Sequence, residues 1–300
     1  MRLFIVILLL VLAGTTPSIA SERIESPHFL FVYQDGKKAM AAELARRSET
    51  VLKQVCATLG NKADEVGQIN VAIYHGADAF NQALAQWGAR VEWAAGIAIP
   101  SQNQILLRID AQTRFNIHDI FRHEVSHIAL HNAVGGHRIP RWFNEGIAVH
   151  QAGERILERW RRTAEASLSD GLIPFETLKT GFPANGLRAD LAYAQSTAFV
   201  SYLIKLHSWQ AIRVLLKHVR NGSGFDASVR RVFGRSLVNL EREWRLEVDR
   251  RASWIPFLTG TGILWIIISG LFVLSWAVNR HRTRLRLQAM DEPELDDEYA

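Results

Sequence analysis

Two histidines one helical turn apart are the residues of this chain best suited to chemistry. They belong to the segment HEVSH at 123–127. In a helix, His123 and His127 lie on the same face because they are four residues apart. Two imidazoles in that position can bind one zinc ion at roughly 2.0–2.1 Å each. Glu124 can then reach a metal-associated water as a general base. The spacing indicates either a hydrolytic zinc site or a histidine-rich pair of core helices.

The position of a third ligand separates these interpretations. One class of zinc protease uses a histidine six residues after the second, but Ala133 occupies that position. His131 and His137 stand at other spacings, whereas Glu145 follows Pro140, a residue that suits the start of a helix. A Gly-Gly turn between the two helices would let the second fold back against the first. Three protein ligands would leave the fourth position to water, which is the open geometry of catalytic zinc.

The elements that must position these residues follow a simple order, with strands first and helices later. Alternating apolar and β-branched residues indicate strands, and a period of 3.6 residues indicates helices. Strands are expected at 28–34 and 68–75 and in a hairpin at 93–110, and helices at 37–60 and 78–87. From Asn116, a residue that favours the N-cap, nearly everything indicates helix. This order predicts an α+β fold with a small sheet and a helical subdomain.

The N-terminal end of the chain is too apolar for a soluble fold. Arg2 precedes an apolar run that closes with small residues at Ala20. This pattern is typical of a signal peptide at 1–20, and a retained membrane anchor is the alternative. The mature domain is then expected at 21–252, with a mainly sheet lobe at 21–115 and a helical part at 116–252.

The C-terminal end carries a second apolar segment. Ile255–Val278 has no charged residue over roughly 24 positions, which is enough to cross a membrane, and a buried core helix is the alternative. Arginines follow the segment, and such clusters stay on the cytoplasmic side. We therefore expect a single-pass protein of the cell (inner) membrane, with a transmembrane helix at 254–278 and a cytoplasmic tail at 279–300. The domain before the helix would be extracytoplasmic, or periplasmic.

Composition argues against a disulfide-stabilised domain and against a nucleic-acid-binding protein. The single cysteine, Cys56, allows no internal disulfide in an exported domain. The sequence pI is 9.5, but the arginines beside the apolar segment account for much of the positive charge. We therefore expect no nucleic-acid partner, and the sequence sets no oligomeric state.

Three motifs resemble the gluzincin metallopeptidases of the thermolysin-like clan, and their peptidase MA-like branch in particular. They are GIAIP at 96–100, HEVSH at 123–127 and PRWFNEGIA at 140–148. The resemblance extends over about residues 68–205. It implies one zinc ion per chain held by His123, His127 and Glu145, with Glu124 as the general base.

The resemblance also implies how a peptide or protein substrate is held. An edge strand of the small mixed sheet would lie over the HEVSH helix, and the backbone of Gly96, Ile97 and Ala98 would pair with the extended substrate. Tyr193 best matches the tyrosine that relatives place near the oxyanion of the tetrahedral intermediate. A packing role is the alternative for this residue.

The chain also departs from the family pattern. Val149 stands where thermolysin-like relatives often have a carboxylate that orients a ligand histidine, which leaves His150 and Asp119 as candidates for that role. The GIAIP segment lacks the glutamate with which the aminopeptidase branch holds a free amine. The sequence therefore predicts a membrane-anchored zinc endopeptidase that uses a zinc-activated water. The alternative is a non-catalytic peptide- or protein-binding module on the same scaffold.

Overall fold

The computed structural model describes residues 22–34, 36–86, 94–109, 116–153, 163, 166, 171–252 and 261–290. The predicted signal peptide at 1–20 and residues 291–300 of the predicted tail lie outside these ranges. The chain divides into two compact units, one of residues 1–163 and 172–244 and one of residues 164–171 and 245–300. All candidate site residues belong to the first unit.

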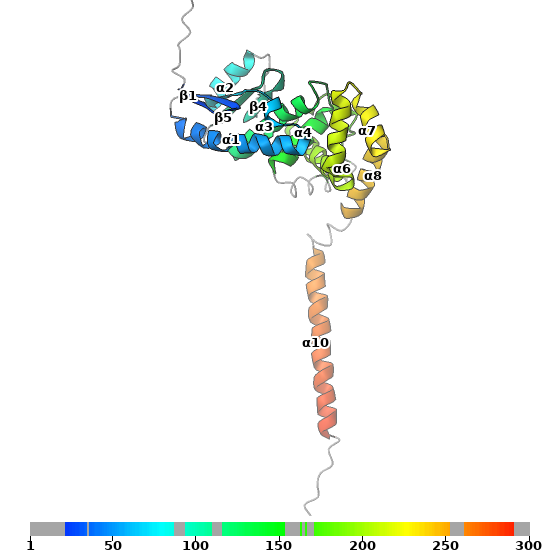
Figure 1. The fold of residues 1–300 in the computed structure, drawn as a ribbon. Helices are drawn as coiled ribbons and strands as arrows, with labels where there is room; N and C mark the ends of the chain where they lie inside the picture. Colours follow the sequence, from blue (N-terminus) through cyan, green and yellow to red (C-terminus); the bar gives the residue numbers. More distant parts are fainter. Residues whose placement is uncertain are drawn as a thin grey trace, which may run out of the picture. The chain divides into compact units, whose positions relative to one another are not determined.

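The first unit contains a mixed sheet (Figure 1). The sheet has five strands in the order β1-β2-β3-β5-β4. Strands β2, β3 and β5 are parallel, and β1 and β4 are antiparallel to their neighbours. The strands are β1 Glu22–Glu25, β2 Phe29–Tyr33, β3 Ile69–His75, β4 Gly96–Ile99 and β5 Gln104–Ile109. The sequence did not predict β1 because its residues, ERIE, show no apolar alternation.

Helices cover both faces of this sheet. On one face, Phe121 of α3 (Ile117–Ala133) packs against Phe29 and Phe31 of β2, with ring centroids 5.7 and 6.0 Å away. Helix α1 (Lys38–Leu59) packs against both β2 and α3. On the other face, α2 (Gly76–Ala85) packs its buried Phe80 and Leu84 against Leu106 of β5. The sheet therefore gives α3 a fixed support.

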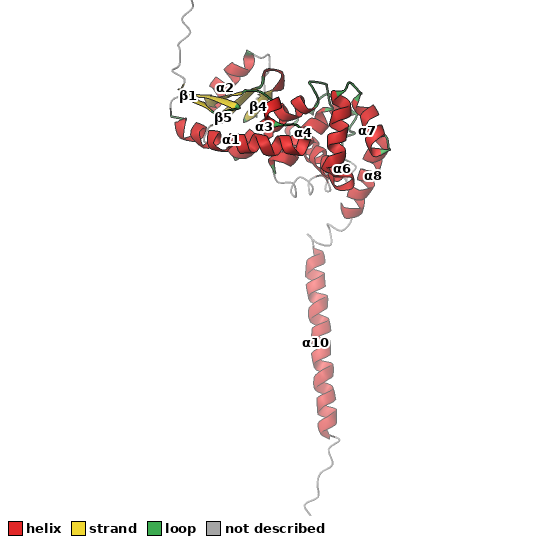
Figure 2. Ribbon diagram, in the orientation of Figure 1, coloured by secondary structure: helices red, strands yellow, loops and turns green. Residues whose placement is uncertain are grey.

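The part of the first unit after α3 is helical, as predicted (Figure 2). Its core is aromatic, with Trp142, Phe175 and Phe199 fully buried and their ring centroids 4.5–5.2 Å apart. The helices are α4 Arg141–Ala152, α6 Gly186–Arg220, α7 Phe225–Phe233 and α8 Leu237–Ala252, of which residues 237–244 belong to this unit. Short 3-10 turns lie at Ala63–Glu65, Pro100–Gln102 and Thr177–Lys179. Together with the mixed sheet, these helices confirm the predicted α+β fold.

The second unit contains one long apolar helix, α10 (Thr261–Met290). Its segment Leu264–Arg286 is long and apolar enough, by length and composition, to cross a membrane. The predicted transmembrane helix at 254–278 thus lies partly in α10, and its first residues are outside the described ranges. The orientation of the chain across a membrane remains a prediction.

Candidate metal centre

Helix α3 presents the two histidines of the HEVSH segment. The Asn116 side chain caps its first turn by accepting a hydrogen bond from the His118 backbone N–H at 3.0 Å. At 3.6 residues per turn, His123 lies roughly 200° around the helix from Phe121, which faces the sheet. His123 and His127 therefore point away from the sheet. After α3, Gly135 and Gly136 adopt positive φ values of 62° and 76°, which turns the chain back toward α3.

Helix α4 presents the third donor. Trp142 and Phe143 bury the first turn of α4 in the aromatic core. At Gly146, an added Cβ would lie 2.6 Å from the Ser196 carbonyl oxygen of α6. Only glycine therefore allows α4 to approach α6 this closely. The motif NEG thus combines a side chain for the site with the close helix contact that holds it there.

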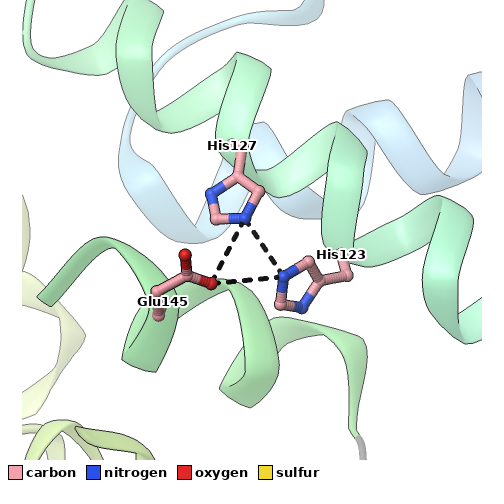
Figure 3. Close-up of side chains that lie close together, drawn as sticks. All are labelled: His123, His127 and Glu145. Atoms are coloured by element: carbon pink, nitrogen blue, oxygen red, sulfur yellow. Dashed lines mark hydrogen bonds and ion pairs between the residues drawn. The ribbon is translucent and has the colours of Figure 1, made fainter. Parts of the chain in front are cut away.

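Three donor atoms converge between the two helices (Figure 3). Nε2 of His123 lies 3.1 Å from Nε2 of His127, and each lies 3.6 Å from Oε2 of Glu145. Donors bound to one tetrahedral zinc ion at about 2.05 Å are separated by roughly 3.3–3.4 Å. The arrangement therefore fits a zinc ion. The predicted meeting of these side chains is confirmed, and their role as ligands remains a prediction.

The environment of Glu145 favours its charged form. Burial alone would raise the pKa of this carboxyl. A hydrogen bond from His123 and electrostatic interactions with His127, His123 and Arg141 outweigh burial and lower the pKa to about 2. Its side chain is only 12% exposed. A buried, ionised carboxylate beside two imidazoles is suited to a cation.

One of the two candidate ligand histidines has a partner that the sequence did not indicate. Nδ1 of His127 lies 2.9 Å from Oδ1 of Asn144, the residue before Glu145. The amide oxygen accepts the Nδ1–H, so the Nε2 lone pair faces the other two donors. His150 does not fill this role, because its Nδ1 lies 3.0 Å from Oγ of Ser201 on α6. The asparagine of the NEG motif was the available signal for this contact.

Glu124 lies against the edge strand. Its side chain is buried, and a Cβ added to Gly96 of β4 would lie 2.9 Å from Oε1 of Glu124. Gly96, Ile97 and Ala98 pair with β5 on one side, and β4 is the last strand of the sheet. The absence of a side chain at Gly96 therefore gives the carboxylate its space. The roles of Glu124 and of this strand remain predictions.

Tyr193 of α6 lies close enough to the site to respond to its charges. Burial raises the pKa of its hydroxyl, and the negative charges of Glu145 and Glu124 raise the pKa further, while Arg141 opposes them. The hydroxyl therefore keeps its proton at neutral pH and can donate a hydrogen bond. Phe182 packs against the Tyr193 ring at 4.9 Å, edge to face. The position suits the predicted oxyanion donor without establishing that role.

The other histidines considered as ligands belong elsewhere. His123, His127 and Glu145 are the only group of three or more metal-binding side chains found in the part of the chain that the structure describes. His131 and His137 are therefore not part of a metal-binding group there. Nε2 of His118 lies 2.8 Å from Oε1 of Glu43 on α1. These results leave Glu145 as the third donor.

Comparison with known families agrees with this geometry. Residues 49–250 match the family model described as Peptidase MA superfamily. The match is wider than the stretch of about 68–205 over which the motifs resemble that family, and it contains every candidate site residue. No curated protein is similar enough in sequence to be reported as a relative. The chain therefore belongs to the Peptidase MA superfamily and is a metallopeptidase with a candidate zinc site.

Proposed function

We propose that the protein is a membrane-anchored zinc endopeptidase that cleaves peptides or proteins outside the cytoplasm. The observation that carries this proposal is the convergence of three donor atoms within 4.8 Å of one another in a Peptidase MA domain. His123, His127 and Glu145 would hold one zinc ion per chain. Such an ion supplies a Lewis acid and lowers the pKa of water toward about 7.

The side chains around the donors have complementary tasks in this proposal. Glu124 takes the proton of the attacking water and later delivers it to the leaving amine. Its neighbour β4 supports this task, because Gly96 gives the carboxylate room. The Tyr193 hydroxyl donates to the oxyanion, and a donor aimed at developing charge can contribute about 3–4 kcal/mol.

The edge strand β4 would align the substrate. Its backbone at Gly96, Ile97 and Ala98 is paired with β5 on one side only within the described sheet, so an extended peptide can add to the other side. The segment GIAIP carries no acidic residue to hold a free amino terminus. Cleavage inside a chain is therefore favoured over removal of terminal residues.

The apolar helix α10 would anchor the enzyme in the cell (inner) membrane. Leu264–Arg286 has the length and composition for one crossing. The arginines at 280, 282, 284 and 286 lie at the C-terminal end of this segment and favour a cytoplasmic location for that end. A signal peptide at 1–20 would send the domain at 21–252 to the periplasmic side.

Glu124→Gln tests this function. The amide keeps the shape of the side chain but cannot accept the proton of water. We expect kcat on an internally quenched peptide to fall about 10²–10⁴-fold while the zinc content stays equal to wild type. Glu43→Gln on α1, where the carboxylate contacts His118, is the matched control and should leave kcat unchanged.

Two results would contradict the proposal. A Glu124→Gln variant that cleaves at the wild-type rate would remove Glu124 from the mechanism. A folded, zinc-loaded wild-type protein that binds peptides without cleaving any of them would support the binding-module alternative instead.

A further inference from the structure

Arg141 contacts the side of the metal centre that faces away from the histidines. Its Nε lies 3.6 Å from Oε1 of Glu145, one helical turn later on α4. The other oxygen of the same carboxylate, Oε2, lies 3.6 Å from Nε2 of both His123 and His127. The two oxygens of Glu145 therefore have separate partners, a cation on one side and the two imidazoles on the other.

Aromatic side chains fix the position of this guanidinium. The Arg141 Cζ lies 5.2 Å from the centroid of the Phe182 ring, in a cation–π contact. Phe182 in turn packs edge to face against Tyr193. Arg141 also lies close enough to Tyr193 for its charge to oppose the rise in the pKa of that hydroxyl. One guanidinium thus links Glu145, the third candidate metal ligand, to Tyr193, the residue predicted to donate a hydrogen bond to the oxyanion.

The chemistry of arginine suits this link. Its planar group has five N–H donors in a fixed fork, so it can serve two acceptors at once, whereas a lysine ammonium acts as a point charge on a flexible stem. A solvent-exposed ion pair at this helical spacing would contribute little. Here, however, Arg141 is 43% exposed and Glu145 only 12% exposed, so the guanidinium meets a largely buried carboxylate.

We propose that Arg141 is a positioning residue with two effects. It holds Oε1 of Glu145 on the outer side, so that Oε2 alone faces the metal position. It also holds the Tyr193 hydroxyl in place beside the reacting carbonyl. The second effect rests on the proposed function. The first concerns metal binding and can be tested whether or not the protein cleaves a substrate.

Two substitutions at Arg141 separate these effects. Arg141→Met removes the charge and keeps an apolar stem, and Arg141→Lys keeps the charge but loses the fork. We measure zinc affinity by competition with a chelator, and kcat and KM on a quenched peptide, for the full chain in detergent. Arg141→Met should weaken zinc binding about 10-fold and lower kcat about 10-fold or more. Arg141→Lys should bind zinc within about threefold of wild type and keep the low kcat, with KM unchanged.

Arg138→Met is the matched control. Arg138 is exposed in the turn before α4, three residues before Arg141, so this substitution removes the same charge from a neighbouring position. It should alter neither zinc affinity nor kcat. Phe182→Leu removes the ring under the guanidinium without changing any charge. Phe182→Leu should lower zinc affinity and kcat, as Arg141→Met does. It therefore keeps the proposal testable if Arg141→Met does not fold.

The outcomes that overturn each effect differ. Zinc affinity of Arg141→Met within twofold of wild type removes the role toward Glu145. Full recovery of kcat in Arg141→Lys shows that charge alone suffices and removes the role of the fork toward Tyr193. A wild-type protein that cleaves nothing would end the proposed function, while the zinc measurements on the same variants would still decide the first effect.

Discussion

The three candidate metal ligands lie on two helices, whereas the residues that hold these helices in place come from three. His123, His127 and Glu145 lie close together along the sequence, on α3 and α4. Gln151, near the end of α4, instead connects these helices to α1. Its side chain accepts from Ser126 Oγ of α3 and donates to the Val55 carbonyl oxygen at 3.1 Å.

Gln151 makes two further hydrogen bonds, one through its side chain and one through its backbone. The Gln151 amide also donates to Thr58 Oγ1 on α1. The backbone carbonyl oxygen of Gln151 accepts from Nε of Arg122, whose Nη1 donates to the side-chain oxygen of Gln54 at 2.9 Å. Residues from three helices thus meet in one polar network, in which Ser126 and Gln151 are buried. The comparison teaches that local helix geometry presents the candidate ligands. Hydrogen bonds between residues far apart in the sequence hold the helices that carry them in place.

If this comparison holds, zinc affinity should fall less as the changed residue is further from the donors. Asn144→Ala, which removes the partner of His127 Nδ1, should have the largest effect. The imidazole loses the contact that fixes its tautomer and orientation, so zinc affinity should fall about 10–100-fold. Competition with a chelator measures this, and Asn239→Ala on the exposed face of α8 is the control. An unchanged affinity would show that Asn144 does not orient His127.

Gln151→Leu should affect stability more than zinc affinity. The leucine leaves the Ser126 hydroxyl and the Val55 carbonyl without this partner inside the protein. We expect the free energy of unfolding in urea to fall by about 1–3 kcal/mol, and zinc affinity to fall less than in Asn144→Ala. Gln68→Leu at an exposed position is the control. A loss of zinc binding larger than that of Asn144→Ala would break the distinction between the two regions.

Labelling of Cys56 should respond least to zinc, because this buried residue belongs to α1, which carries none of the three candidate ligands. Burial, with a smaller contribution from the charge of Glu65, raises the pKa of its thiol to about 12. The group is therefore a neutral thiol at every pH well below 12 in the folded state. Most unfolded thiols ionise by about pH 9. A thiolate-specific reagent at that pH should label unfolded protein rapidly and native protein slowly, with or without zinc. Rapid native labelling would show that α1 opens locally.

Much of the fold was predictable because its signals are local. The pattern BiBiB of buried and half-buried residues in β2 is the alternation that indicated this strand. Gly60, with a positive φ of 87°, ends α1 where the sequence placed the end of that helix. The strand β1 was missed because it is charged and exposed, and it is part of the sheet only through pairing with β2.

The sequence by itself determined the donors, because the spacing of His123 and His127 and the motif NEG act within two helices and one turn. Only the tertiary structure decided what surrounds them. The Gln151 contact with Val55 joins residues 96 positions apart. Arg141 contacts Phe182, which lies in a loop much later in the chain. Such contacts leave no periodic signal in the sequence, because they arise only when the core brings separate elements within reach of short-range interactions.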